Sequence, residues 1–317
     1  MYQAGMAAVA NDKEDDMTKR VIDSHAHIGD IFHGNKNITF KTNINKGNYE
    51  DPFVECERSG YVNPLIPENA DDLINAGQYR CWEWTLENLT AELDKHPEVE
   101  GIVALPIWPN QTFEEYLAAS KLEPRVIPFT SCVLDLPMED MVKKLRADIN
   151  RGAKGLKLHP TIQNVPLSDP RIEAAVKVFI EAKLPVLTHC GANPYYTADS
   201  PWSKVTTPAY SDFSKVIEFC RKWQDANIIV AHNCSTAGIL FENVKDLNNV
   251  YTDTSMCSAD NMRLGVRLMG EDKILFGTDV PFGSFHYSLA ELEKAFPDDP
   301  GTIDMVGYSN MARLMRL

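Results

Sequence analysis

The feature that most constrains the fold is a regular alternation of short apolar segments with segments of helical periodicity. The eight apolar segments are residues 21–28, 101–106, 125–132, 153–160, 184–190, 227–234, 249–255 and 273–281. Strands that alternate with helices form a parallel sheet. Eight such units within 317 residues fit a closed barrel better than an open sheet. The sequence therefore predicts an α/β fold, a (β/α)8 TIM barrel.

The pattern also divides the chain. Residues 1–20 carry no strand or helix pattern and do not resemble a signal peptide, so we expect a flexible N-terminal tail before one barrel domain, residues 21–317. A polar stretch rich in Asn, Gly and Pro runs from Gly29 to Ala76, after the first strand, and shows no clear period. A connection of this length usually has a function. We expect a long loop or lid, followed by a helix over Tyr79–His96.

Charge and cysteine usage exclude several classes of protein. The net charge is -14 and the isoelectric point is near 5.0, which is the wrong sign for binding nucleic acid or an anionic membrane surface. No apolar run approaches the length of a membrane span. The seven cysteines are odd in number, scattered and without a CxxC pair, so they indicate neither a disulfide framework nor a cysteine zinc site. We expect reduced cysteines and a cytoplasmic protein.

Side chains that bind metals or transfer protons cluster at the predicted strand ends. His25 and His27 end the first strand, and alternate residues of a strand share one face, so the pair is suited to hold a metal. The later strand ends carry Lys157 and His159, His189, His232, and Asp279. In a barrel of this type the active site lies at the carboxyl ends of the strands. Five of the eight histidines therefore meet where chemistry is expected.

These motifs resemble the amidohydrolase superfamily, and most closely its amidohydrolase-2 branch of metal-dependent hydrolases, lactonases and nonoxidative decarboxylases. The resemblance lies in DSHAH, GLKLHP, LTHC, AHNCS and FGTDVP, in that order, and in Asn310 and Arg313-Leu314 near the end of the chain. It implies one divalent metal, with zinc expected first and manganese, iron or nickel as alternatives. The implied ligands are His25, His27, His189 and Asp279. Imidazole and carboxylate ligands suit such metals independently of the resemblance.

The resemblance also implies catalytic roles. Asp279 would bind the metal and take the proton from an attacking water molecule. His232 would act as a general acid/base or polarise the substrate carbonyl. Asp23, two residues before His25, is expected to support the ligands rather than bind the metal itself.

Lys157 leaves a second arrangement open. It shares a strand face with His159 and should point into the barrel, where an ammonium is costly unless it is paired, neutralised or modified. Lysines on this strand of the superfamily are often carboxylated and bridge two metals, and GLKLH is similar to the corresponding urease segment. In that binuclear case His25, His27 and Asp279 would hold one metal, and His189 and His232 the other. The branch typically uses one metal, which we favour.

In the mononuclear form Lys157 would contact substrate or pair with Asp23 or Asp253. His159 would contact substrate or cap its strand before Pro160. Further candidate substrate contacts are His33, Arg58, Trp108, Tyr195 and His286.

The predicted function is hydrolysis of an amide, ester or lactone bond in a small molecule by metal-activated water. The alternative is nonoxidative decarboxylation of an aromatic or unsaturated carboxylic acid, which needs a cationic clamp such as Arg58 or Lys204. A third alternative is an inactive barrel that serves as a binding module. Barrels of this type often self-associate, so a homodimer is expected by analogy.

Overall fold

The computed structural model of the chain describes residues 20–34, 51–60, 70–232 and 237–317. The predicted tail therefore lies outside the described residues except for Arg20, and so does part of the polar stretch. The strands are β1 Val21–Ala26, β2 Val99–Ala104, β3 Val126–Pro128, β4 Thr130–Ser131, β5 Leu156–Leu158, β6 Val186–Thr188, β7 Ile228–Val230, β8 Val250–Asp253 and β9 Ile274–Leu275. Every pairing between these strands is parallel.

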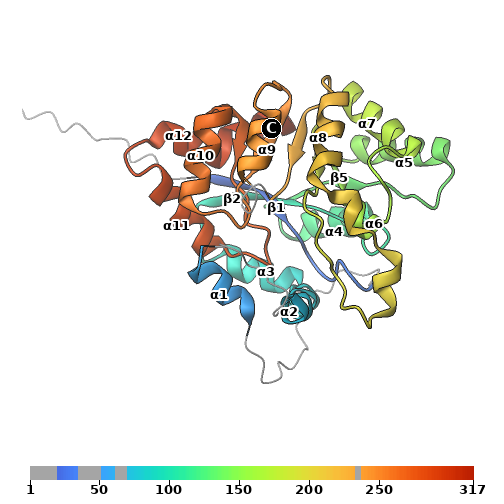
Figure 1. Cartoon of the computed structure of the whole chain (residues 1–317), viewed down its shortest axis with the longest axis horizontal. Coiled ribbons are helices and arrows are strands. Elements are labelled where there is room, and N and C mark those ends of the chain that lie inside the picture. Colours follow the sequence, from blue (N-terminus) through green and yellow to red (C-terminus); the bar gives the residue numbers. More distant parts are fainter. Residues whose placement is uncertain (1–19, 35–50, 61–69, 233–236) are drawn as a thin grey trace, which may run out of the picture.

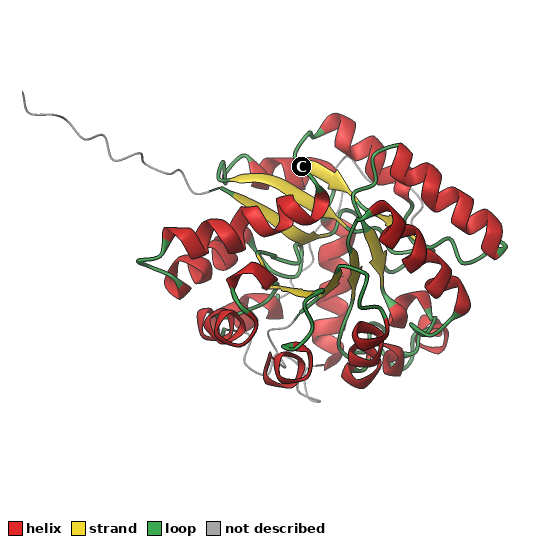
Figure 2. Ribbon diagram, turned by 90° about the horizontal axis from the view of Figure 1, so that it is seen from above, coloured by secondary structure: helices red, strands yellow, loops and turns green. Residues whose placement is uncertain are grey.

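The strands close into a barrel. They form two hydrogen-bonded runs, β1 to β3 and β4 to β9. Phe129 joins β3 to β4, and its N–H donates to Ala104 O at 3.1 Å. On the other side Ala26 bridges to Val280, and the N–H of Asp279 donates to His25 O at 2.8 Å. The predicted TIM barrel is confirmed, with the third predicted strand divided into β3 and β4. Figure 2 shows the strands inside and the helices around them.

Hydrophobic side chains fill the barrel from within and cover it from outside. The interior cluster contains Ile22, Val103, Leu187, Ile229, Tyr251 and Leu275 from the strands, Phe129 between β3 and β4, and Met311, Leu314 and Met315 from the last helix. Val186 and Val230 instead face outward, in a cluster with residues of the surrounding helices. The last helix packs into the interior cluster, and Nδ2 of Asn310 donates to Ile274 O at the first residue of β9, at 2.9 Å. The helix therefore lies at the end of the barrel opposite the strand carboxyl ends.

The helices are α1 Pro52–Arg58, α2 Ala70–Glu83, α3 Leu86–Leu93, α4 Phe113–Leu122, α5 Met138–Asn150, α6 Pro160–Gln163, α7 Pro170–Ala182, α8 Phe213–Lys222, α9 Ala237–Val244, α10 Ala259–Met269, α11 Phe285–Ala295, α12 Pro300–Asp304 and α13 Asn310–Met315. Capping residues visible in the sequence mark where several of these helices begin. Thr112 and Glu115 form a capping box at α4, and Asp169 caps α7.

The polar stretch differs from the expected loop. Residues 29–34 of it are irregular, and its later described part forms α1 and the start of α2. Helices α1, α2 and α3 gather at one edge of the molecule (Figure 1). Asp51 caps α1 and Pro52 occupies its first turn, which is a helix start without a visible apolar period. The prediction of a single helix over Tyr79–His96 is also wrong. Helix α2 already begins at Ala70, and the predicted helix is not continuous. It is divided at Thr85, whose hydroxyl caps α3.

The described residues bear on two expectations, that no segment spans a membrane and that the cysteines are reduced. No helix there is both long enough and apolar enough to cross a membrane. The six cysteines in the described part of the chain are free and buried. Cys234 lies outside the described residues.

Candidate metal centre

The first part of the site lies where β1, the first strand of the barrel, meets the segment after the last strand, β9. Nε2 of His25 and Nε2 of His27 lie 3.5 Å and 3.4 Å from Oδ1 of Asp279. All three side chains are buried. The contact follows from the backbone pairing of β1 with the segment after β9, because Asp279 N–H donates to His25 O. These are three of the four ligands that the resemblance implies, and the structure brings them together.

His232 approaches the same carboxylate from the end of β7. Its Nδ1 lies 3.7 Å from Oδ2 of Asp279. One ligand atom each from His25, His232 and Asp279 falls within 4.8 Å of the others. His232 and Asp279 both have left-handed backbone angles, with φ of 60° and 61°. Such angles are strained for residues with a Cβ and cluster at functional sites.

His189 lies on the other side of His232, with ring centroids 4.8 Å apart. Its ring stacks on that of His159 at 4.1 Å, and its Nε2 lies 2.7 Å from the hydroxyl of Tyr195. Nδ1 of His189 is buried and has no hydrogen-bond partner. His159 also caps the short helix α6 at its start, whereas the expectation from sequence was a cap of the preceding strand. The five strand-end histidines form one cluster at the barrel mouth.

The electrostatics of the cluster favour neutral imidazoles. Burial lowers the pKa of His27 and of His189 to about 3, and Lys157 adds to the shift. Burial also holds the pKa of His25 and of His232 well below the usual range. A neutral imidazole offers a lone pair to a metal, whereas imidazolium does not. The pKa of Asp279 is held well above its usual range, chiefly by burial, with Lys157 opposing the shift.

A buried atom without a hydrogen-bond partner tests whether a metal fits. It is Oδ1 of Asp279, which lies beside Nε2 of His25 and Nε2 of His27. A buried polar atom normally has a partner, and one without a partner requires an explanation. Imidazole nitrogen and carboxylate oxygen are the donors that zinc and other transition metals take. The ligand atoms that lie within 4.8 Å of one another come from His25, His232 and Asp279, and this group does not include His189. These donors and the unpartnered oxygen fit a divalent metal.

Lys157 points into the barrel as predicted. It pairs in register with Leu187, a residue of the interior cluster. Its Nζ lies 3.2 Å from Nε2 of His25. Burial lowers its pKa to about 8, against the attraction of Asp279 and Asp253.

Asp23 and Asp253 support the centre from behind. Oδ1 of Asp23 accepts from the N–H groups of His25 and Thr278, at 2.9 Å and 3.0 Å, which ties β1 to the last barrel segment. Oδ2 of Asp253 lies 2.8 Å from Nδ1 of His25. From the sequence Asp253 is expected only as a partner of Lys157, and its contact with a candidate ligand is not predicted. The signal available was its place at the end of a strand, next to Thr254 and Ser255.

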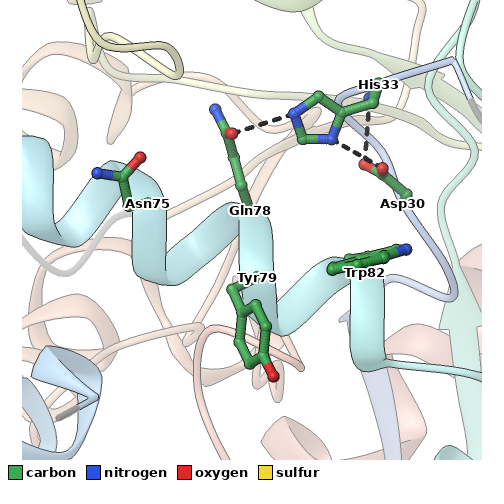
Figure 3. A pocket seen from close by; sticks show the side chains of 6 residues that line it. All are labelled: Asp30, His33, Asn75, Gln78, Tyr79 and Trp82. Carbon is green, nitrogen blue, oxygen red and sulfur yellow. Dashed lines mark hydrogen bonds and ion pairs between the residues drawn. The ribbon is translucent and has the colours of Figure 1, made fainter. Parts of the chain in front are cut away.

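A pocket lies between the segment after β1 and helix α2. Its volume is about 380 Å³, and it is lined by Asp30, His33, Asn75, Gln78, Tyr79 and Trp82. Figure 3 shows His33 between Asp30 and Gln78, with ring nitrogens 2.8 Å and 3.1 Å from their side-chain oxygens. The amide of Gln78 donates to Tyr195 O at 2.7 Å, which connects the pocket wall to the residue that covers His189.

The other predicted substrate contacts are less closely placed. Tyr195 lies against His189, as described above. Arg58 is on α1, with a side chain 73% exposed and 3.5 Å from Glu55. His286 is exposed near the start of α11. Trp108 follows β2, is partly buried and packs against the outer cluster. Of these five residues, the structure brings Tyr195 to the centre and His33 to the pocket against α2.

Solved structures share this architecture at low sequence identity. An uncharacterized TIM-barrel protein from Bordetella bronchiseptica is 15% identical with a TM-score of 0.63, and the match covers 94% of this chain and 98% of that one. A 5-carboxyvanillate decarboxylase from Novosphingobium aromaticivorans, with bound manganese, is 13% identical with a TM-score of 0.61, covering 94% and 97%. A probable 2-pyrone-4,6-dicarboxylic acid hydrolase from Acinetobacter baumannii is 12% identical with a TM-score of 0.57, covering 94% and 100%.

The comparison with curated proteins found no match. The family model described as Amidohydrolase, of the amidohydrolase-2 type, matches residues 22–317. That range omits only Val21, the first residue of β1, and so includes every residue of the centre. The chain therefore belongs to the amidohydrolase-2 family.

Proposed function

We propose that this protein is a metal-dependent hydrolase that cleaves an amide, ester or lactone bond in a small molecule. The observation that carries the proposal is the buried Asp279 carboxylate. Its Oδ1 lies between His25 and His27 without a hydrogen-bond partner, while its Oδ2 faces His232. A carboxylate placed between metal-type ligands and a second base suits both metal binding and proton transfer.

The residues that would hold the metal are His25, His27, His189 and Asp279. Zinc is our first choice because neutral imidazoles outnumber carboxylates in this set. In such a site a divalent metal polarises a carbonyl oxygen and lowers the pKa of water. The proximity of His232 to Asp279 also keeps the binuclear alternative, with carboxylated Lys157, as an outcome to be tested.

The chain's own residues would move the protons. Hydrolysis joins the oxygen of water to the acyl carbon and breaks the bond to the leaving nitrogen or oxygen. Asp279 would accept one proton from that water and return it to the leaving group, so the two products together contain one added water. His232 would act as a second general acid/base, accepting a proton from the substrate or water and returning it. Tyr195 would border the substrate beside His189.

Nonoxidative decarboxylation is the second candidate, and the aromatic rings at the barrel mouth favour it. Phe32 stacks on Tyr195 at 5.9 Å and meets Phe282 at 6.1 Å, and Phe282 lies 6.2 Å from His27. These rings would pack against an aromatic acid. The manganese-bound neighbour is a decarboxylase. The exposed Arg58 offers weak support as a carboxylate clamp, so the buried Lys157 is the better candidate.

The test compares the two reactions on one preparation. Purified protein is analysed for bound metal and then assayed against aryl esters, lactones and anilides, and against hydroxylated benzoates with detection of carbon dioxide. We expect metal-dependent hydrolysis that Asp279→Asn reduces by at least about 10³-fold, since the variant removes a ligand and the proton acceptor together. The matched control is Asp246→Asn, a change of the same type at an exposed ion pair with Arg221.

Each other outcome has a definite meaning. Carbon dioxide release without hydrolysis would replace the first candidate with the second. Two metals per chain with a carboxylated Lys157 would establish the binuclear form. Protein that holds no metal, and in which Asp279→Asn changes no activity, would support the inactive barrel.

A further inference from the structure

Asp253 and Ser255 contact two histidines of the centre from behind. Asp253 is the last residue of β8, and Ser255 follows two positions later. Oδ2 of Asp253 lies 2.8 Å from Nδ1 of His25. The hydroxyl of Ser255 donates to Oδ1 of Asp253 at 2.5 Å and lies 2.9 Å from Nδ1 of His232. One carboxylate therefore reaches His25 directly and His232 through a single hydroxyl.

We infer that Asp253 and Ser255 form a relay that fixes both histidines in the Nδ1–H tautomer, so that each keeps the lone pair on Nε2. The pair would thus be positioning residues for a ligand and for a catalytic base. Their effect on turnover rests on the function proposed above. The tautomers themselves do not depend on which reaction the centre performs.

The first half of the inference follows from the hydrogen-bonding capacity of a carboxylate. A carboxylate only accepts, so Nδ1 of His25 must carry the proton that it shares with Asp253. Lys157 gives independent support on the other side of the ring. An ammonium only donates, and Nζ of Lys157 lies 3.2 Å from Nε2 of His25, which must then be the acceptor. Nε2 is also the atom that faces Asp279.

The second half follows from the single proton of a hydroxyl. Because Ser255 donates that proton to Asp253, its oxygen can only accept from His232. Nδ1 of His232 must then carry a proton, and its Nε2 keeps the lone pair needed to accept one from substrate or water. Without the relay, the Nδ1 proton would have no fixed partner, and the Nε2–H tautomer that free imidazole prefers would compete.

The geometry holds the relay in place. Oδ1 of Asp253 also accepts from the backbone N–H groups of Ser255 at 3.1 Å and of His232 at 3.2 Å. Both Asp253 and Ser255 are buried. Gly277 keeps room for the carboxylate, since a Cβ there would lie 3.2 Å from that of Asp253. Buried hydrogen bonds that orient ligand histidines typically change metal affinity or activity about 10- to 100-fold when removed.

The test reads the tautomers directly. Chelator-treated, metal-free protein with ¹⁵N-labelled histidine is examined by long-range ¹H–¹⁵N correlation spectroscopy, with signals assigned from His25→Gln and His232→Gln. We expect a protonated Nδ1 in both rings. In Ser255→Ala we expect His232 to shift toward the Nε2–H form while His25 stays unchanged, and Ser255→Thr should restore the wild-type pattern. Ser258→Ala, which removes the nearby cap of α10, should shift neither ring.

Kinetics and metal titration separate this inference from the proposed function. We expect Ser255→Ala to lower kcat by about 10- to 100-fold with little change in KM, and Asp253→Asn to weaken zinc binding by a similar factor through His25. A wild-type His232 protonated at Nε2, or a Ser255→Ala spectrum identical to wild type, would overturn the inference. If Ser255→Ala does not fold, the wild-type spectrum decides alone. A protein without hydrolase activity would refute the proposed function and leave the tautomers to stand or fall on the spectra.

Discussion

At the residue scale, burial and neighbouring charges together decide whether a buried group is charged. The histidines of the centre lie among other bases, and burial together with Lys157 lowers their pKa values. Glu123 is also buried, yet its pKa is lowered because Arg125 donates to both of its oxygens at 2.8 Å. The sequence shows both kinds of residue but not these surroundings.

Glu123 gives a prediction on pH and stability. Its folded-state pKa lies below its usual value of about 4.5, so its contribution is fully present above that value and is lost as the pH falls through the folded-state pKa. We expect Glu123→Gln to lower the free energy of unfolding at pH 7, and the difference from wild type to shrink below about pH 4.5. Urea denaturation at pH 7, 5, 4 and 3.5 measures this. A pH-independent difference would contradict it, and Glu218→Gln at an exposed α8 position is the control.

At the element scale, close packing between neighbouring strands positions the site. Gly155 precedes β5, the strand that carries Lys157, and a Cβ at Gly155 would lie 2.3 Å from the ring of Phe129. Phe129 is fully buried in the interior cluster, so its ring has nowhere to move. A residue without a side chain is therefore needed here for β4 and β5 to pair.

We expect Gly155→Ala to destabilise the protein by about 3 kcal/mol, at the upper end for overpacking, because the added methyl overlaps a buried ring. Chemical denaturation gives the free energy of unfolding. Adding Phe129→Leu to Gly155→Ala should recover part of the loss by making room. Gly301→Ala, at an exposed position in α12 where the nearest atom is 3.4 Å from the new Cβ, should leave stability unchanged or slightly higher. A Gly155→Ala protein as stable as wild type would refute the packing argument.

At the scale of the whole molecule, barrel closure joins residues from the two ends of the chain. Asp23 and Thr278 are 255 positions apart and share hydrogen bonds of 2.5 Å and 3.0 Å. His25, His27 and Asp279 meet across the same seam. A metal held by these ligands would therefore bind only the closed barrel, and its binding energy would add to the stability of the fold.

We expect zinc or manganese to raise the thermal unfolding midpoint of chelator-treated protein. At a free metal concentration of 100 times Kd the gain is about 2.7 kcal/mol. Differential scanning calorimetry with and without metal measures it. Asp279→Asn should abolish most of the shift, and Asp246→Asn should keep it. An equal shift in Asp279→Asn would show that the metal binds elsewhere.

Much of the fold and of the candidate site can be predicted because both follow a local pattern. Eight apolar runs and the amphipathic segments between them predict the barrel, and strand ends place His25, Lys157 and Asp279 at one mouth. The errors arise where the pattern is weak. Helix α1 has a cap and a proline but no apolar period, and the break at Thr85 interrupts a continuous helical pattern.

The sequence by itself determined the order of strands and helices and the residue types at each strand end, because backbone periodicity and side-chain chemistry are local properties. Tertiary structure alone decided which neighbours those residues have. Asp253 lies behind His25, and Tyr195 covers His189, because contacts across a closed barrel depend on register and strand tilt, which no local pattern records. The same closure left Oδ1 of Asp279 buried without a partner, and that atom is what most directly indicates a metal.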